Sequence, residues 1–455
     1  MEITRFNVGQ TPVTAYAVPS ADGPIVIMAH GFAGSEQMMQ GYAMPLARAG
    51  YQVYVFEFLG HGRHPAPMSG DVASVDGTTR LLVEQTIEVI NALGSGGKPV
   101  TLLGHSMATD ILVRVAATRP EIGAVVLISA FSQVIDEVTP TNLLLVTGAW
   151  EPGLRAFGLE ALRMVDPAAS EGDVAINGAV IRRAVVAPFS EHVSVLHSRI
   201  GRRAVLDWLD QTYARTSDTT ILPSGWAILG VLAGLVLLFR RIAKIVPRGH
   251  STPLVLGKKQ TALVLLVPAL FAPLLAVPLN PGFLPVLVAD YLGLHLLIYG
   301  GMQLLLLKLW GHPLGRIDWA GFGVLLVWCA VFGFVLDRYA ANFWPTNDRP
   351  WIIGIMLIGA LPYMIADAAL TAAGGFLKRF AVRLSFLISL GIAIALDFQG
   401  LFFLIMIAPV LVLFYLVFGT MGRDISRRSG PLSSGLALGI VLAWALGVSF
   451  PLFQS

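Results

Sequence analysis

The chain has 455 residues, of which 55% are apolar and only 13% are charged, and its formal net charge is +3. This composition excludes an ordinary soluble globular protein, in which about a quarter of the residues are charged. Residues 1–218 hold 21 of the 28 acidic but only 15 of the 31 basic residues, so the first half is acidic and the second half is basic. The apolar runs of the second half reach membrane-spanning length. We therefore expect a soluble domain at 1–215 and a polytopic membrane domain at 216–455.

Short runs rich in β-branched residues alternate with longer amphipathic runs in the first 215 residues. The short runs predict buried strands at 24–30, 51–58, 98–104, 124–130, 141–148 and 182–188. The amphipathic runs predict helices at 77–93, 106–119, 153–165 and 199–213. Such alternation predicts an α/β fold with a mostly parallel sheet covered on both faces. A ligand site is expected beyond the carboxyl ends of the strands.

The stretch LLGHSMATD (102–110) places a serine between a predicted strand and a predicted helix. Its centre, Gly104 to Ala108, reads G-x-S-x-A, one methyl group away from a G-x-S-x-G pattern. A strand that turns sharply into a helix strains its corner residue, so small residues are needed two positions before and after it. Such a turn exposes the serine hydroxyl beside a helix N-terminus, which favours developing negative charge. These residues alone leave two interpretations open, a nucleophilic Ser106 or a serine that caps the helix.

Three motifs, taken in order, resemble the α/β-hydrolase superfamily, in particular its small esterases and monoacylglycerol-lipase-like members. MAHGFAGS (28–35) resembles the oxyanion loop after the third strand, and LLGHSMA (102–108) resembles the nucleophile elbow. FEFLGHGRH (56–64) is similar to the D-x-x-G-H-G segment of the family, with Glu57 where Asp is usual. The resemblance covers residues 3–214, and the membrane half resembles no family that we recognise.

The resemblance implies a serine hydrolase. The histidines and acidic residues show no recognisable metal-ligand spacing, so we expect neither a metal nor another cofactor. Ser106 would be the nucleophile, and the backbone N–H groups of Phe32 and Met107 would form the oxyanion hole. His30 and His61 would shape loops beside that hole. His105 would be the variable position of the elbow, and His64 is interpreted as a surface residue.

A nucleophilic serine needs a base and a carboxylate that orients the base, and in this family the chain order is Ser, acid, His. Glu151 follows the predicted strand 141–148 at the position of the family acid, with Asp136 and Asp166 as rivals. His192 follows the strand 182–188 and matches the family histidine, with His197 as its rival.

The segment between the predicted strands 124–130 and 141–148 is too short for a lid domain, which many family members insert there. Only FSQVIDEVTP (131–140) lies between these strands. We therefore expect an α/β-hydrolase fold without a lid domain, whose site is open or covered by something outside the domain. The bilayer is the expected neighbour.

Apolar runs in the second half predict eight transmembrane helices, and thus an all-α membrane domain. They lie near 221–239, 261–279, 283–307, 320–336, 351–377, 384–396, 401–420 and 435–454. The sixth run is short, so the range 384–420 could instead be one bent helix, which would make the count seven. Residues 213–225 form the linker before the first span.

The loops between these spans carry fourteen basic residues on one side of the membrane and two on the other. The positive-inside rule places the basic loops in the cytoplasm, so the soluble domain would lie outside it, on a bacterial inner membrane. The opening stretch MEITRFNVGQ has no signal-peptide pattern, which argues instead for a cytoplasmic domain. We expect the extracytoplasmic placement. The basic residues flank the spans, so they argue for a membrane surface and against nucleic acid as a partner.

The sequence therefore favours a membrane-anchored serine esterase or lipase that cleaves acyl or lipid-like esters. A thioesterase or an acyltransferase could use the same Ser-His-Glu triad. A third possibility is a transporter or sensor whose hydrolase-like domain only binds a ligand. The ionisable residues Asp290, His295, Asp367 and Asp397 lie in or beside predicted spans, where such residues are often functional, but no transporter signature accompanies them. Cys329 is the only cysteine, which excludes an intramolecular disulfide. The sequence gives no indication of the oligomeric state.

Overall fold

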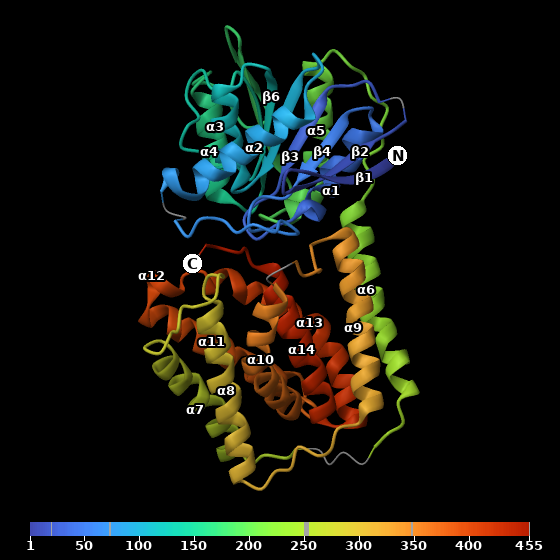
Figure 1. Ribbon diagram of the computed structural model, residues 1–455, viewed down its shortest axis with the longest axis vertical. Coiled ribbons are helices and arrows are strands. Elements are labelled where there is room, and N and C mark those ends of the chain that lie inside the picture. The colour runs from blue at the N-terminus through green and yellow to red at the C-terminus, as the bar shows by residue number, and fades with distance from the viewer. Residues whose placement is uncertain (20, 72–73, 250–253, 347–348, 455) are drawn as a thin grey trace. The chain divides into compact units, whose positions relative to one another are not determined.

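The computed structural model (Figure 1) describes residues 1–19, 21–71, 74–249, 254–346 and 349–454. The chain divides into two compact units. The first unit comprises Met1–Gly230 with two short later segments, Asp337–Asn342 and Pro451–Gln454. The second unit comprises Val231–Leu336 and Phe343–Phe450.

A nine-stranded sheet forms the centre of the first unit. Its strands are β1 (Glu2–Val8), β2 (Thr11–Ala17), β3 (Ile25–Ala29), β4 (Gln52–Phe56), β5 (Val100–His105), β6 (Ile122–Ile128), β7 (Asn142–Gly148), β8 (Val174–Asn177) and β9 (Val180–Ala187). Their order across the sheet is β1-β2-β4-β3-β5-β6-β7-β9-β8. The six predicted strands are the six neighbours β4-β3-β5-β6-β7-β9 in the centre of the sheet, and they are all parallel.

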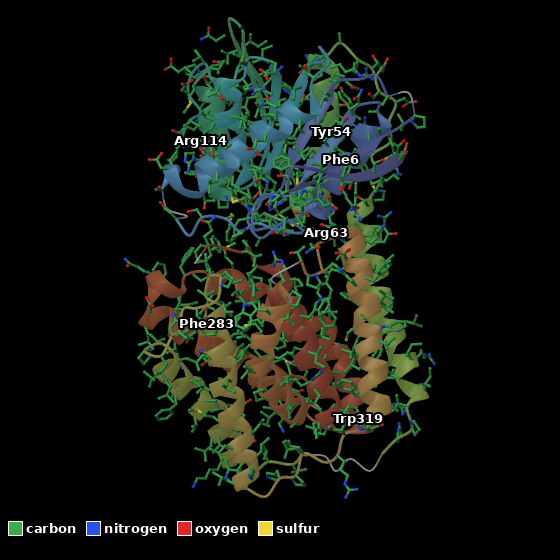
Figure 2. All side chains as sticks on the ribbon, in the orientation of Figure 1. Phe6, Tyr54, Arg63, Arg114, Phe283 and Trp319 are labelled. Atoms are coloured by element: carbon green, nitrogen blue, oxygen red, sulfur yellow. The ribbon has the colours of Figure 1, made fainter. Side chains whose placement is uncertain are left out.

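The sequence did not predict the antiparallel strands β1, β2 and β8 at the two edges of the sheet. Most residues of β1 and β8 are exposed, so these strands lack the continuous apolar run by which buried strands are recognised. β1 is held partly by an aromatic contact: the ring of Phe6 meets that of Tyr54 in β4 edge to face, with the centroids 6.5 Å apart (Figure 2).

Helices cover both faces of the sheet, as the alternation of strands and helices predicted. These helices are α1 (Glu36–Arg48), α2 (Arg80–Leu93), α3 (Ala108–Thr118), α4 (Pro152–Arg163) and α5 (Arg199–Thr212). In β6, Val126 packs in the same core as α1 and α5, whereas the neighbouring Val125 packs in the core that includes residues of α3 and α4. This alternation follows from the two-residue period of a strand. The sequence missed α1, whose Pro45 and polar residues weaken the helical pattern.

The connection from β6 to β7 contains no helix, so the lid domain that the sequence excluded is indeed absent there. This connection is fastened by Arg182, a residue of β9 whose side chain is fully buried. Its guanidinium donates to the carbonyl oxygens of Asp136 and Thr139 in the connection, the latter at 3.1 Å, and to that of Ala161 in α4 at 3.0 Å. Burial lowers the pKa of Arg182 below its usual value, and the negative charge of Asp136 opposes this shift.

Arg182→Ala should lower the free energy of unfolding of the first unit by roughly 3 kcal/mol, because it removes a fully buried side chain and its charged hydrogen bonds to three carbonyl groups. The matched control is Arg183→Ala, since the more exposed Arg183 makes a single bond to the carbonyl of Gly172 at 3.1 Å. The control should cost less than about 1 kcal/mol. Denaturant titration followed by tryptophan fluorescence measures both values. Equal losses for the two variants would contradict the role given to Arg182.

Eight helices among the described residues are long and apolar enough to cross a membrane. They are α6 (Ser224–Ile242), α7 (Lys258–Ala276), α8 (Ala289–Leu309), α9 (Trp319–Tyr339), α10 (Arg349–Thr371), α11 (Phe376–Leu396), α13 (Leu404–Ser429) and α14 (Pro431–Ser449). The short helix α12 (Phe398–Leu401) separates α11 from α13. The range 384–420 is therefore not one bent helix, and the count is eight rather than seven.

Glycines allow the helices of the second unit to approach each other closely. A Cβ atom on Gly300 of α8 would lie 2.4 Å from the Cα atom of Tyr363 in α10. A Cβ atom on Gly435 of α14 would lie 2.4 Å from the Cα atom of Ile365, also in α10. Small residues at helix contacts are typical of membrane bundles, where close backbone packing replaces the hydrophobic effect as the driving force.

The four ionisable residues that the sequence singled out in or beside the spans each have a partner within the second unit. Asp367 accepts two hydrogen bonds from the guanidinium of Arg383, at 3.2 and 3.1 Å. His295 lies between the hydroxyls of Tyr291 and Ser389, at 2.8 and 3.0 Å. Asp290 accepts from the N–H of Leu284 at 2.8 Å, and Asp397 accepts from the N–H of Gly400 at 2.9 Å. Asp290 and His295 thus have separate partners, and Asp397 caps α12 as an ordinary turn residue.

Candidate active site

Ser106, Glu151 and His192 meet at one edge of the sheet although they are far apart in the sequence. Ser106 follows β5, Glu151 lies three residues after β7, and His192 lies five residues after β9. These strands are parallel, so their carboxyl ends lie at the same edge. Ligand sites of open parallel sheets lie at this edge.

The backbone turns sharply at Ser106, which has the left-handed φ of 53°. A Cβ atom on Gly104 would lie 2.7 Å from Cδ1 of Leu112 and 3.0 Å from Cβ of Ala108, so a side chain before the turn would have to displace both residues. The methyl group of Ala108 does fit after it. The cap position of α3 is Met107 rather than Ser106, and no side chain caps this helix end. The interpretation of Ser106 as a helix cap is therefore wrong.

The Ser106 hydroxyl lies in a chain of hydrogen bonds. Its Oγ is 2.8 Å from Nε2 of His192, and Nδ1 of the same ring is 2.6 Å from Oε1 of Glu151. The side chain of His192 is 43% exposed, whereas that of Glu151 is 6% exposed. A partly open imidazole can exchange protons with a ligand, while a buried carboxylate orients it from behind.

Both carboxylate oxygens of Glu151 accept hydrogen bonds. Oε1 faces Nδ1 of His192, and Oε2 accepts from the Ser129 hydroxyl and from the Gly148 N–H, each at 2.7 Å. Burial alone would raise the pKa of Glu151. The hydrogen bonds from His192, Ser129 and Gly148 outweigh burial and lower the pKa below its usual value. The carboxylate is therefore ionised at neutral pH. The sequence did not reveal Ser129, because no motif marks a residue that follows β6.

His105 supports the loop that carries His192. Its Nε2 lies 2.8 Å from the backbone carbonyl oxygen of His192, so this nitrogen carries the hydrogen that is donated. Burial, followed by the nearby charge of His192, lowers the pKa of His105 to about 4. The ring is therefore neutral at physiological pH and cannot act as a proton carrier there. The motif alone identifies His105 only as the variable position of the elbow and does not predict this hydrogen bond.

The loop after β3, which includes Phe32, lies against the serine. A Cβ atom on Gly31 would be 2.9 Å from Cβ of Ser106 and 2.9 Å from Nδ1 of His105. His30 anchors the start of this loop by accepting a hydrogen bond from the N–H of Phe58 at 3.2 Å. The expected oxyanion donors are the N–H groups of Phe32 and Met107. Phe32 follows Gly31, which lies against Ser106, and Met107 follows Ser106 itself.

The two short later segments of the first unit contact the loops around Phe32. Within the first, the Asn342 N–H donates to the hydroxyl of Ser35 at 3.0 Å. Within the second, the ring centroid of Phe453 lies 6.4 Å from that of Phe32. The backbone around Phe453 also exchanges hydrogen bonds of 2.8 and 2.7 Å with that of Met68. No sequence motif could reveal these contacts, because they join segments that are hundreds of residues apart.

The rival candidates lie in other surroundings. His197 ends a short 3-10 helix (Ser194–His197), and its Nδ1 is buried without a hydrogen-bond partner. Asp136 accepts bonds from the N–H groups that follow it in its own loop, and so does Asp166. His64 is buried rather than a surface residue, with its Nε2 3.4 Å from the Thr11 hydroxyl. Among the described residues, no group of three or more His, Cys, Asp or Glu side chains could hold a metal ion.

Residues 21–195 match the family described as serine aminopeptidase, S33. This part of the chain is an α/β-hydrolase domain. Solved structures similar to the hydrolase domain include a candidate lipase from Acinetobacter baumannii, with 14% identity over 47% of this chain and 92% of that one and a TM-score of 0.35. Another similar structure comes from work on carboxylesterases of Nitrososphaera gargenis. It has 12% identity over 46% of this chain and 98% of that one, and a TM-score of 0.33.

Epoxide hydrolase I of potato, Solanum tuberosum, is also similar, with 12% identity over 46% of this chain and 99% of that one and a TM-score of 0.34. No curated protein matches the chain in sequence.

Gly31→Ala should lower kcat/KM of the hydrolase at least 100-fold, because the added methyl group would push the loop of Phe32 away from Ser106. The thermal midpoint of unfolding should change little, since the loop can shift outward. Gly153→Ala is the matched control, because a Cβ atom there would meet nothing within 4 Å. Full activity of Gly31→Ala would show that this loop does not take part in the site.

Proposed function

We propose that the protein is a membrane-anchored serine hydrolase that cleaves carboxylic esters of acyl or lipid-like compounds through an acyl-enzyme. The observation that carries this proposal is the hydrogen-bonded chain Ser106–His192–Glu151, with distances of 2.8 and 2.6 Å at the carboxyl edge of the sheet. A nucleophile, a base and an orienting carboxylate in this order are the components that acyl transfer requires.

The reaction begins when Ser106 Oγ attacks the ester carbonyl carbon and its proton passes to Nε2 of His192. The carbonyl oxygen becomes an oxyanion, which accepts hydrogen bonds from the N–H groups of Phe32 and Met107. The tetrahedral intermediate collapses, the bond to the alcohol breaks, and His192 returns the proton to the leaving alcohol. Water then attacks the acyl-enzyme with His192 as base, and the carboxylic acid and free Ser106 are formed.

Glu151 makes two contributions in this mechanism. It fixes the ring of His192 so that Nδ1 carries a hydrogen and Nε2 is available as the base. It also stabilises the imidazolium that forms when His192 takes the proton. The lowered pKa of Glu151 supports this role, because the carboxylate remains charged well below neutral pH.

Exposed apolar side chains beside the triad support an apolar acyl substrate. Trp150 and Val193 are the immediate neighbours of Glu151 and His192 and are 64% and 49% exposed. Phe131 and Phe189 lie on the loops after β6 and β9 and are 56% and 83% exposed. Large apolar side chains gathered on the loops that carry a site are typical of surfaces that bind apolar ligands.

Ser106→Ala should reduce hydrolysis of p-nitrophenyl butyrate by at least a thousandfold, because it removes the nucleophile but little volume. His192→Ala should cause a comparable loss, and Glu151→Gln a smaller one, since the amide keeps the shape without the charge. His197→Ala is the matched control and should keep nearly full activity.

Full hydrolysis by Ser106→Ala would disprove the proposed triad, and an inactive His197→Ala beside an active His192→Ala would show that the base is His197. Activity on acyl thioesters but not on oxygen esters would instead favour a thioesterase. Ester hydrolysis absent from the unmodified protein would favour a domain that only binds its ligand.

We also propose that the hydrolase domain lies outside the cytoplasm of a bacterial inner membrane, because the loops on the other side of the spans carry the basic residues. In a Cys329→Ser background, the matched changes Val138→Cys and Val255→Cys probe the two sides at exposed valines. A thiol reagent that does not cross the inner membrane should label Val138→Cys in cells with a permeabilised outer envelope. It should label Val255→Cys only after lysis, and the reverse pattern would place the domain in the cytoplasm.

A further inference from the structure

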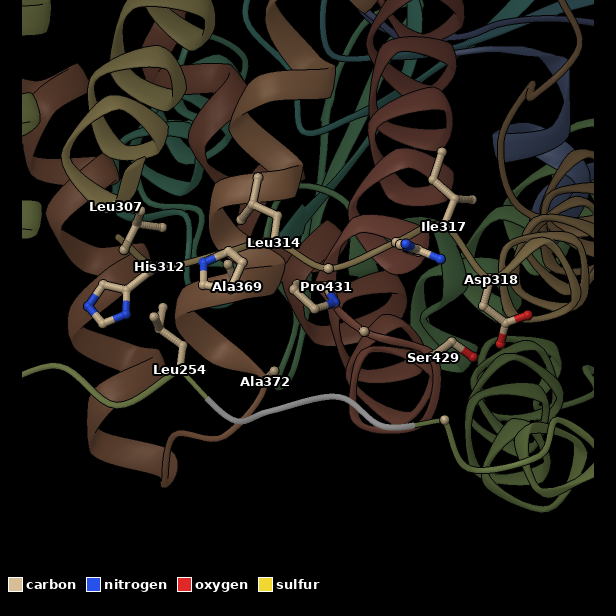
Figure 3. A pocket seen from close by; sticks show the side chains of 15 residues that line it. Leu254, Leu307, His312, Leu314, Ile317, Asp318, Ala369, Ala372, Ser429 and Pro431 are labelled. Carbon is tan, nitrogen blue, oxygen red and sulfur yellow. The ribbon is translucent and has the colours of Figure 1, made fainter. Parts of the chain in front are cut away.

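A pocket of about 440 Å³ lies within the second unit, where several of its helices begin or end (Figure 3). It is formed by the ends of α8, α10 and α13, the start of α14 and the connection from α8 to α9. Its apolar wall includes Leu254, Leu307 and Leu314. The loops and adjoining helix ends on this side of the second unit carry fourteen basic residues, so the pocket lies at the basic end of this unit.

Polar groups in the pocket are left without partners, although burying such groups is unfavourable. Ser429 lines the pocket and is 7% exposed, and its hydroxyl has no hydrogen-bond partner. Nε2 of His312, another lining residue, is likewise shielded from solvent without a partner. A ligand that accepts hydrogen bonds would satisfy the Ser429 hydroxyl, and also Nε2 of His312 in the tautomer that carries its hydrogen there.

The start of α14 supplies further donors at the same place. Gly430, at the cap position, has no side chain to accept from the first N–H groups of this 19-residue helix, and Pro431 occupies its first turn. Both residues line the pocket. The unpaired N–H groups and the dipole of a helix N-terminus favour an anion.

The lining holds one positively charged and one negatively charged side chain, Arg316 and Asp318. Arg316 contributes a guanidinium, which binds phosphate oxygens in pairs. Asp318 is the one carboxylate of the lining, and its Oδ1 is already engaged by the Ala320 N–H at the start of α9, at 3.0 Å.

We propose that this pocket binds the phosphate group of an amphiphile, as in the headgroup of an anionic lipid. Arg316, His312, the Ser429 hydroxyl and the first turn of α14 would hold the phosphate oxygens. The leucine wall would contact the apolar part of the molecule, for which a free phosphate ion has no equivalent. This binding site is separate from Ser106 and does not depend on the proposed hydrolase activity.

The experiment uses the purified full-length protein in a neutral detergent and an ether-linked dialkyl phosphatidic acid, which an esterase cannot cleave. The thermal midpoint of unfolding is followed by tryptophan fluorescence as lipid is added, and it should rise with lipid concentration. Dialkylglycerol, which lacks the phosphate, should cause no rise. Inorganic phosphate should act only at much higher concentrations, because it cannot use the leucine wall.

Two variants and a control locate the binding. Arg316→Gln should weaken binding of the ether lipid at least tenfold, because a charged donor is lost. Ser429→Ala should weaken it severalfold and yet raise the midpoint of the lipid-free protein, since it removes a buried hydroxyl without a partner. Arg240→Gln makes the same charge change at an exposed residue outside the lining and should bind like the unmodified protein.

The proposal would be overturned if Arg316→Gln and Ser429→Ala bound the ether lipid as tightly as the control. An equal response to dialkylglycerol would also overturn it, because the phosphate would then play no part. An equal response to inorganic phosphate at the same concentration would contradict the assignment of an amphiphile and indicate a site for soluble phosphate.

Discussion

The left-handed backbone of Ser106 is the constraint on which the candidate site depends. A non-glycine residue in this conformation costs of order 1–3 kcal/mol, which the surrounding structure must offset. β5 and α3 hold the turn on either side, and the lack of a side chain at Gly104 leaves room for Leu112 and Ala108. Without this turn the serine hydroxyl would not project beyond the sheet toward His192. The imidazole, the carboxylate of Glu151 and the loop of Phe32 would then not surround one reactive atom.

The carboxylate of Glu151, the loop of His192 and the loop of Phe32 are each held beside Ser106 by a different type of contact. Glu151 is fixed at both oxygens by short hydrogen bonds, and the loop of His192 is tied back to the elbow through His105. The loop of Phe32 lies so close to the serine that a single methyl group at Gly31 would not fit. The edge of the sheet can therefore carry a rigid site, although the connection from β6 to β7 contains no lid helix.

The sequence predicted the central part of the fold well because the physical signals there are strong. Strands buried on both faces are mostly apolar, and this signal marked the six parallel strands even though β9 carries Arg182 and Arg183. Membrane helices must satisfy their own backbone and cover the hydrocarbon core, so long apolar runs identified all eight. The edge strands β1 and β8 were missed because their exposed residues carry no such pattern, and α1 was missed because Pro45 interrupts its pattern.

Ser106, His192 and Glu151 could be named from the sequence because each follows a predicted strand of a parallel sheet and fits a known order of motifs. Ser129 and His105 could not, because their importance lies in one hydrogen bond each, and hydrogen bonds between distant loops leave no periodic signal. The same holds for Asn342 and Phe453, which reach the loops around Phe32 from much later in the chain. Contacts of this kind follow from tertiary structure and not from local pattern.

The central claim is that Ser106 is the nucleophile of a working hydrolase, and covalent labelling tests it most directly. The full-length protein would be treated with a fluorophosphonate, digested, and analysed by mass spectrometry to locate the phosphonyl group. We predict one adduct, on the peptide that contains Ser106, which is lost in Ser106→Ala and formed much more slowly in His192→Ala. An unlabelled Ser106 in folded protein, or equal labelling of Ser106→Ala at another residue, would contradict the account.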